Sequence, residues 1–286
     1  MDFRTDLAIE IKESLPRKTS DGIETVAFEK SGVKVTKIKI TNSEGEQAIG
    51  KPCGTYITAE IPNLTKYSCA DESVMAILGS LLSDFLPTDG TVLTVGLGND
   101  NITPDALGPL SCSMILATRH ISGELAKSVG LDSLRPSAVH TPGVLGQTGV
   151  ESAEIIKGIV RQINPAAVIV IDALAARRLS RLGCTVQMSD TGIIPGSGVG
   201  NSRAEISKSI LGIPVVSIGV PTVVDAGTLV HGLIGESTPL KKENSNMIIT
   251  PREIDLVIDR AARLVGMAVN KALQPHISAE EILMLL

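Results

Sequence analysis

The sequence predicts an α/β protein in which a mainly parallel sheet is flanked by helices. Hydrophobic residues make up 43% of the 286 residues, but aromatics only 2%, so the apolar content is mainly Val, Ile, Leu and Ala. Beyond residue 73, short runs of Val and Ile alternate with helical stretches, which is typical of parallel strands covered on both faces. Residues 22–62 have a shorter, strand-like pattern and predict an N-terminal β-rich segment. We expect a single domain over residues 1–286.

Within the β-rich segment, two apolar pairs alternate with polar residues but differ in phase. Val33 and Val35 form one pair and Ile38 and Ile40 the other, which suggests a bulge or bend between them. Residues 42–50 are polar and contain glycine, as in a turn region, and residues 56–61 predict a further strand.

From residue 73 onward, helices and strands are expected to alternate. An apolar strand at 91–95 leads into a glycine loop at 96–99, after which Thr103 is placed to cap a helix with Pro104 in its first turn. The remaining expected elements are helices at 73–83, 152–162, 173–182 and 252–273, strands at 168–171 and 214–220, and a short C-terminal helix.

Charge and composition argue against several classes of protein. The formal net charge of −5 disfavours a nucleic-acid-binding surface, which needs clustered Lys and Arg. The charged N-terminus lacks the apolar region of a signal peptide, and no apolar run approaches the ~20 residues of a membrane helix. The four cysteines have no CxxC spacing, which favours reduced thiols in a cytoplasmic protein.

Acidic residues and glycines gather where the predicted strands end, the edge at which α/β sheets collect ligands and chemistry. Asp105, Asp172, Asp190 and Asp225 all lie at or just past such ends. On pattern alone, Asp105 and Asp172 are better explained as helix caps than as catalytic residues. The tripeptide 190–192 (DTG) also occurs in pepsin-like proteases, but three residues recur by chance.

Other catalytic and binding motifs are incomplete. Asn101 stands where a GxGxxG pattern needs its third glycine, and the loop around Ser197 lacks the P-loop Lys-Ser/Thr. Pro195 replaces the first glycine of a serine-hydrolase elbow. The histidines are dispersed, and no HExxH zinc signature occurs; they are His120, His140, His231 and His276.

Six motifs together resemble the germination protease family of spore-forming Firmicutes, in order and in approximate spacing over nearly the whole chain. They are 95–99 (VGLGN), 103–109 (TPDALGP), 171–175 (IDALA), 189–193 (SDTGI), 195–201 (PGSGVGN) and 219–225 (GVPTVVD). The resemblance implies a fold similar to that of hydrogenase maturation endopeptidases, in which the equivalent acidic positions bind a metal. It also implies an atypical aspartic endopeptidase without a cofactor, with catalytic residues Asp105 and Asp172.

The resemblance further implies a biological role. The family degrades small acid-soluble spore proteins in the spore core at germination, is made as a self-processing zymogen, and is homotetrameric. No direct contact with nucleic acid or membrane is expected. Loop residues expected to support the site are Gly98, Asn99, Asp190, Gly196, Ser197 and Gly198.

The N-terminus itself contains a pattern like a family cleavage site. Family substrates are cut after an acidic residue that is followed by an apolar residue and then Ala, with another acid further on. Asp6, Leu7, Ala8 and Glu10 follow this order. We therefore expect residues 1–6 to be a propeptide that is removed by cleavage between Asp6 and Leu7.

Two carboxyls in one site resist double ionisation, so one of them can activate water while the other donates a proton. The helix start at Asp105 favours this residue as the base. Two alternatives stay open: a metal-dependent maturation-type endopeptidase with a third ligand, and a non-catalytic protein that binds an anion.

Overall fold

A computed structural model describes residues 4–16, 21–61, 72–121, 123–128, 130–234 and 247–286. These residues form a nine-stranded sheet in the order β1-β2-β3-β7-β8-β6-β4-β5, with β9 paired to β8. The strands are β1 Ile23–Lys30, β2 Val33–Ile40, β3 Gly54–Glu60, β4 Val92–Gly96, β5 Ser137–His140, β6 Ala167–Ala176, β7 Thr185–Ser189, β8 Val215–Asp225 and β9 Ile248–Ile249. The neighbours β5, β4, β6 and β8 are parallel, and the N-terminal strands extend the same sheet through antiparallel pairs. The predicted α/β class is confirmed.

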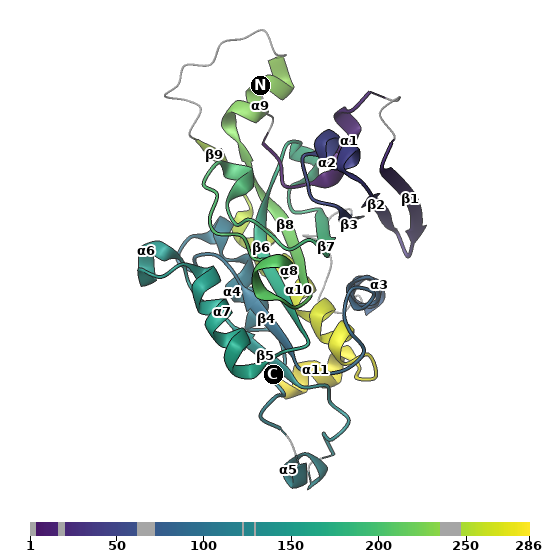
Figure 1. Ribbon diagram of the computed structural model, residues 1–286, viewed down its shortest axis with the longest axis vertical. Coiled ribbons are helices and arrows are strands. Elements are labelled where there is room, and N and C mark those ends of the chain that lie inside the picture. Colours follow the sequence, from purple (N-terminus) through teal and green to yellow (C-terminus); the bar gives the residue numbers. More distant parts are fainter. Residues whose placement is uncertain (1–3, 17–20, 62–71, 122, 129, 235–246) are drawn as a thin grey trace.

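Helices cover both faces of the sheet (Figure 1). Long helix α10 (Ile254–Leu273) packs against α3 (Glu72–Ser83) and α4 (Leu107–Cys112) on one face, and α7 (Ser152–Ile163) lies on the other. The other helices are α1 Ala8–Ser14, α2 Ser43–Ile49, α5 Gly123–Ser128, α6 Leu145–Thr148, α8 Lys208–Leu211, α9 Ala226–Ile234 and α11 Ala279–Leu285, with 3-10 turns η2 Thr103–Asp105, η3 Leu179–Arg181 and η4 Ser197–Val199. No helix among the described residues has both the length and the apolarity needed to cross a bilayer.

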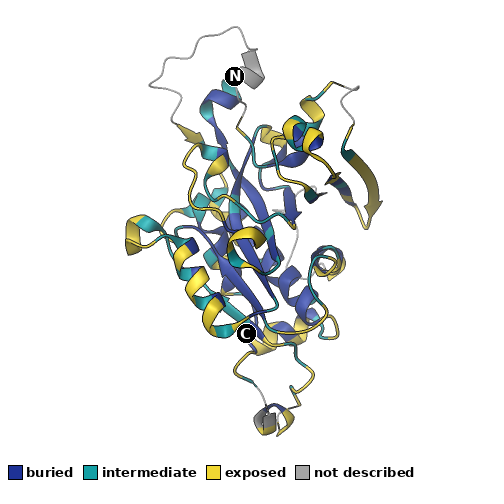
Figure 2. Ribbon diagram, viewed as in Figure 1, coloured by how far each residue is buried: buried dark blue, intermediate teal, exposed yellow. Residues whose placement is uncertain are grey.

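Side chains of strand β6 contribute to three buried clusters, one on one face of the sheet and two on the other. Successive side chains on a strand point to opposite faces. Ile169 and Ile171 join the core under α10, whereas Val168 and Val170 face α7. Further along the α7 face, Leu174 belongs to a third cluster that includes residues of α1. Figure 2 shows this central strand buried along its length.

The helix predicted at 173–182 is wrong. Strand β6 continues to Ala176, paired with β8 throughout, and only residues 179–181 form a 3-10 turn. Leu and Ala favour helices as isolated residues, but pairing with a buried neighbouring strand overrides this preference. Asp172 therefore lies inside a strand and does not cap a helix.

Two expectations for the N-terminal segment also differ from the structure. Strand β2 pairs regularly with both neighbours and has no bulge. The phase shift arises because Val33 and Val35 join the core under α10, while Ile38 and Ile40 join the α1 cluster on the opposite face. Residues 43–49 form helix α2, capped by the Asn42 side chain, where a turn was expected.

The helix predicted from Thr103 is interrupted. Residues 103–105 form the 3-10 turn η2, and α4 begins only at Leu107. Thr103 does not cap η2, because the cap position is Ile102, whose side chain makes no capping hydrogen bond. The predicted helices at 73–83, 152–162 and 252–273 agree with α3, α7 and α10 to within two residues at each end.

Candidate active site

Asp172 is a buried carboxyl on the α7 face of β6, between the Val170 and Leu174 clusters. It is 5% exposed, and it accepts a hydrogen bond from the backbone N–H of Ala173 at 2.9 Å. Burial raises its pKa well above the usual range, and the negative charges of Asp105 and Asp6 raise it further. Asp172 is therefore a carboxyl that favours the protonated form.

Asp105 lies in turn η2, which packs against β6 and β8. The Leu97 N–H donates to the Ile171 carbonyl at 2.8 Å, and the Thr222 hydroxyl donates to the Pro104 carbonyl at 2.7 Å. One Asp105 oxygen accepts the Asn99 N–H at 2.8 Å. Burial raises the Asp105 pKa, and the Asn99 bond offsets part of that effect.

Gly98 is required by the close approach of this turn. It has φ +113, and a Cβ there would lie 2.0 Å from the Asp105 carbonyl oxygen. The structure thus brings together four of the predicted site residues, namely Asp105, Asp172, Gly98 and Asn99. The negative charge of Asp105 contributes to the raised pKa of Asp172, so the two carboxyls are electrostatically coupled.

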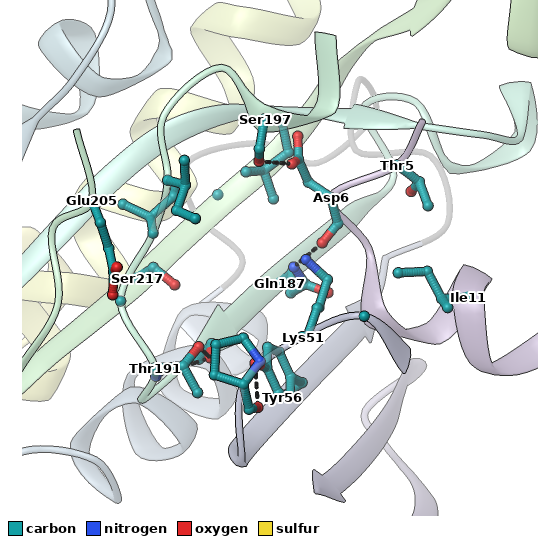
Figure 3. Close-up of a pocket in the computed structure, with 18 of the residues that line it drawn as sticks. Thr5, Asp6, Ile11, Lys51, Tyr56, Gln187, Thr191, Ser197, Glu205 and Ser217 are labelled. Carbon is teal, nitrogen blue, oxygen red and sulfur yellow. Dashed lines mark hydrogen bonds between the residues drawn. The ribbon is translucent and has the colours of Figure 1, made fainter. Parts of the chain in front are cut away.

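A pocket of ≈ 480 Å³ (Figure 3) is lined in part by Leu174, which lies on the same face of β6 as Asp172. Strands β3, β7 and β8 contribute Tyr56, Gln187 and Ser217 to its lining, and the N-terminal segment contributes residues 4–6. Loop residue Ser197 also lines it. Residues 1–3 of the expected propeptide lie outside the described residues.

Asp6 is seated in this pocket by both its backbone and its side chain. Its N–H donates to the Ala175 carbonyl at 2.9 Å, and one carboxylate oxygen accepts the Ala175 N–H at 2.8 Å. The other oxygen accepts the Ser197 hydroxyl at 2.8 Å. Gly198 lies so close that a Cβ there would be 2.1 Å from the Asp6 carboxylate.

The helix that follows Asp6 is held by a buried acid. Glu10 is 2% exposed and accepts the backbone N–H groups of Arg177 and Arg178 at 2.6 and 2.9 Å. It also accepts the Thr5 hydroxyl at 2.5 Å and lies 3.7 Å from the Arg181 guanidinium. The chain on both sides of the Asp6–Leu7 bond is therefore tied to the end of β6.

The remaining predicted site residues have structural contacts. Asp190 is exposed, and its carboxylate accepts the Thr55 N–H at 2.7 Å, which joins the ends of β3 and β7. Asp225 accepts both the N–H and the hydroxyl of Thr228 at the start of α9. Gly196 has φ +74, and a Cβ there would lie 2.3 Å from the Asn201 carbonyl oxygen.

Gln187 and Lys51 were not predicted from the sequence, although both line the pocket. A polar side chain in the apolar run 185–189 was a signal for Gln187, which is only 8% exposed. Lys51 follows a helix in a polar stretch and carried no such signal.

Among the described residues, no three His, Cys, Asp or Glu side chains are grouped to hold a metal ion. His140 ends β5 with Nε2 buried and without a hydrogen-bond partner, and burial lowers its pKa. The described donors do not fit a three-ligand metal centre.

Comparisons with known proteins decide the family. The family model described as germination protease matches residues 4–237. The chain is 42% identical to the germination protease of Caldanaerobacter subterraneus subsp. tengcongensis, covering 99% of this chain and 98% of that protein. The chain belongs to the germination protease family. The family's protein from Clostridium tetani is 39% identical, with 99% and 98% covered, and that from Bacillus pumilus is 36% identical, with 97% and 95% covered.

Membership in the germination protease family makes this chain a protease. Among solved structures, a [NiFe] hydrogenase maturation protease from Thermococcus kodakarensis is 18% identical, with a TM-score of 0.35 over 66% of this chain and 98% of that one. The family match includes Asp105, Asp172 and the seated Asp6.

Proposed function

We propose that this germination protease family member is an atypical aspartic endopeptidase that degrades small acid-soluble spore proteins in the spore core. It cleaves after an acidic residue and needs no cofactor. The observation that carries the proposal is the buried Asp172 in β6, against which turn η2 with Asp105 packs, so that two carboxyls with raised pKa are electrostatically coupled.

The two aspartates take different roles in this mechanism. Asp105 is the less buried of the two, which favours its ionised form relative to Asp172, so it removes a proton from the attacking water. Asp172 is deeper and faces two other carboxylates, so it keeps the proton that bonds to the peptide carbonyl. That proton then passes to the departing amine as the tetrahedral intermediate collapses.

Self-processing between Asp6 and Leu7 belongs to the same proposal. The seated Asp6 acts electrostatically on Asp172, and residues 4–6 form part of the pocket wall. This position supports residues 1–6 as an inhibitory propeptide whose removal frees the pocket. We also propose a homotetramer that contacts neither nucleic acid nor membrane, and sedimentation of the purified protein tests that state.

The test is mass spectrometry of an acid-soluble spore protein after incubation with wild type, Asp105→Asn and Asp172→Asn, each with and without chelator. Cuts after acidic residues by wild type, lost in both folded variants and unaffected by chelator, are expected. Cleavage abolished by chelator and restored by a divalent metal would establish the maturation-type alternative. No cleavage by any sample would favour the anion-binding alternative.

A further inference from the structure

The contacts of Asp6 are those of a site built for a carboxylate. Each of its two oxygens receives one donor at 2.8 Å, one from the Ala175 N–H and one from the Ser197 hydroxyl. Gly198 leaves room for the carboxylate where any Cβ would collide with it. Such charge-assisted hydrogen bonds are stronger than neutral ones.

A cation contributes to the same site. In Figure 3 the Lys51 side chain points toward Asp6 from the loop before β3. Burial lowers the Lys51 pKa, and the Asp6 charge raises it in part. An uncharged amide in place of the carboxylate could fill the same space but would lose this attraction.

Gln187 holds the carbonyl that precedes the expected cut. Its Nε2 donates to the Asp6 carbonyl at 2.8 Å, while its Oε1 accepts the Ala8 N–H at 2.7 Å. The amide of Ala8 thus fixes which end of the Gln187 side chain faces Asp6. A donor directed at a peptide carbonyl is also the arrangement that stabilises an oxyanion.

The sheet register places Gln187 and Asp172 on the same face of the sheet, two strands apart. Gly219 of β8 is paired with Asp172 of β6 on one side and with Gln187 of β7 on the other. Paired residues face the same side of a sheet, so Asp172 and Gln187 point to the same face, on either side of Gly219. Strands β6 and β7, which carry them, are about 10 Å apart because β8 lies between them. Asp6 connects these two strands, because it is hydrogen-bonded to Ala175 on β6 and to Gln187 on β7.

We infer that the Ala175 N–H, the Ser197 hydroxyl and the Gln187 amide form the subsite that recognises the acidic residue before the cut bond. Asp6 occupies this subsite in the intact chain, and an acidic side chain of a protein substrate takes its place after residues 1–6 leave. The inference rests on the proposed function. It concerns the acid side of the cut alone, because Leu7 and Ala8 are fully buried in the α1 cluster.

Two reactions test the subsite. Self-cleavage of the full chain measures recognition of Asp6, and a peptide pair with Asp or Asn before the cut measures recognition of a substrate. Ser197→Ala should slow the appearance of the Leu7 N-terminus roughly ten- to hundred-fold, the effect of losing one hydrogen bond to a charged group. It should lower the Asp-over-Asn ratio of kcat/KM by a similar factor.

Two controls sharpen the result. Ser83→Ala removes an exposed serine of α3 and should change neither rate. Asp6→Asn combined with Ser197→Ala should slow self-cleavage less than the product of the two single effects, because both changes weaken one contact.

The outcomes separate the subsite from the proposed function. A wild type that cleaves, with an Asp-over-Asn ratio that survives Ser197→Ala, overturns the subsite alone. A wild type that cleaves nothing overturns the proposed function. If the wild type cleaves nothing, hydrogen exchange of the Asp6 amide still tests the carboxylate site. Faster exchange in Ser197→Ala but not in Ser83→Ala supports this site, and unchanged exchange overturns it too.

Discussion

Two buried acids in this protein have nearly the same exposure and opposite surroundings. Glu10 is 2% exposed and receives two backbone N–H groups, a hydroxyl and the nearby Arg181 guanidinium. Asp172 is 5% exposed, accepts the Ala173 N–H, and experiences the negative charges of Asp105 and Asp6. Burial alone therefore does not distinguish an acid with structural contacts from the acid proposed to be catalytic.

The difference lies in what each site does to the ionised form. The donors around Glu10 stabilise a negative charge, so this acid fastens α1 to the end of β6. The surroundings of Asp172 disfavour a second negative charge and leave its proton available for transfer. Replacing each acid by its amide therefore tests the comparison directly.

The largest expected effect comes from Asp172→Asn. The amide keeps the shape of the side chain but cannot give up a proton, so kcat should fall roughly 10²–10⁴-fold, the usual contribution of general acid–base catalysis. Stability at neutral pH should be unchanged or higher, because a repelled carboxyl has been removed. Peptide cleavage and urea unfolding measure the two quantities. An active variant, or one with much lower stability, would contradict the chemical role.

Glu10→Gln should do the opposite. The Glu10 carboxylate accepts the backbone N–H groups of Arg177 and Arg178 and pairs with the Arg181 guanidinium. Loss of its charge should lower the free energy of unfolding by about 2–3 kcal/mol. Glu13→Gln is the matched comparison, because Glu13 also pairs with Arg181, at 2.7 Å, but is one-third exposed. Its cost should be smaller, at most about 1 kcal/mol. Equal costs for the two variants in urea unfolding would show that burial of Glu10 contributes nothing.

Sequence patterns predicted the parallel strands and the long helices because each carries a continuous apolar run or an amphipathic period. They failed at β6, where Ala173 and Leu174 prefer helix as isolated residues and only the partner strand β8 makes them extended. Asp105 and Asp172 were reached through the family resemblance, since each also fitted a helix cap. The Glu10 contacts and the Gln187 bridge join residues more than 160 positions apart, so no local pattern reveals them.

The smallest expected effect is a difference in pH dependence, and its sign follows from the raised pKa of Asp172. Between the unfolded value of about 3.9 and the higher folded value, the folded state holds more protons than the unfolded state. This carboxyl therefore destabilises the fold progressively as pH rises through that window. Compared with Asp172→Asn, the wild type should lose stability as pH rises above about 4. Asp259→Asn, which removes an exposed carboxylate on α10, serves as the control and should follow the wild type in a series of urea midpoints. Parallel curves for wild type and Asp172→Asn would mean that Asp172 is ionised in the folded protein, which would return it to the same class as Glu10.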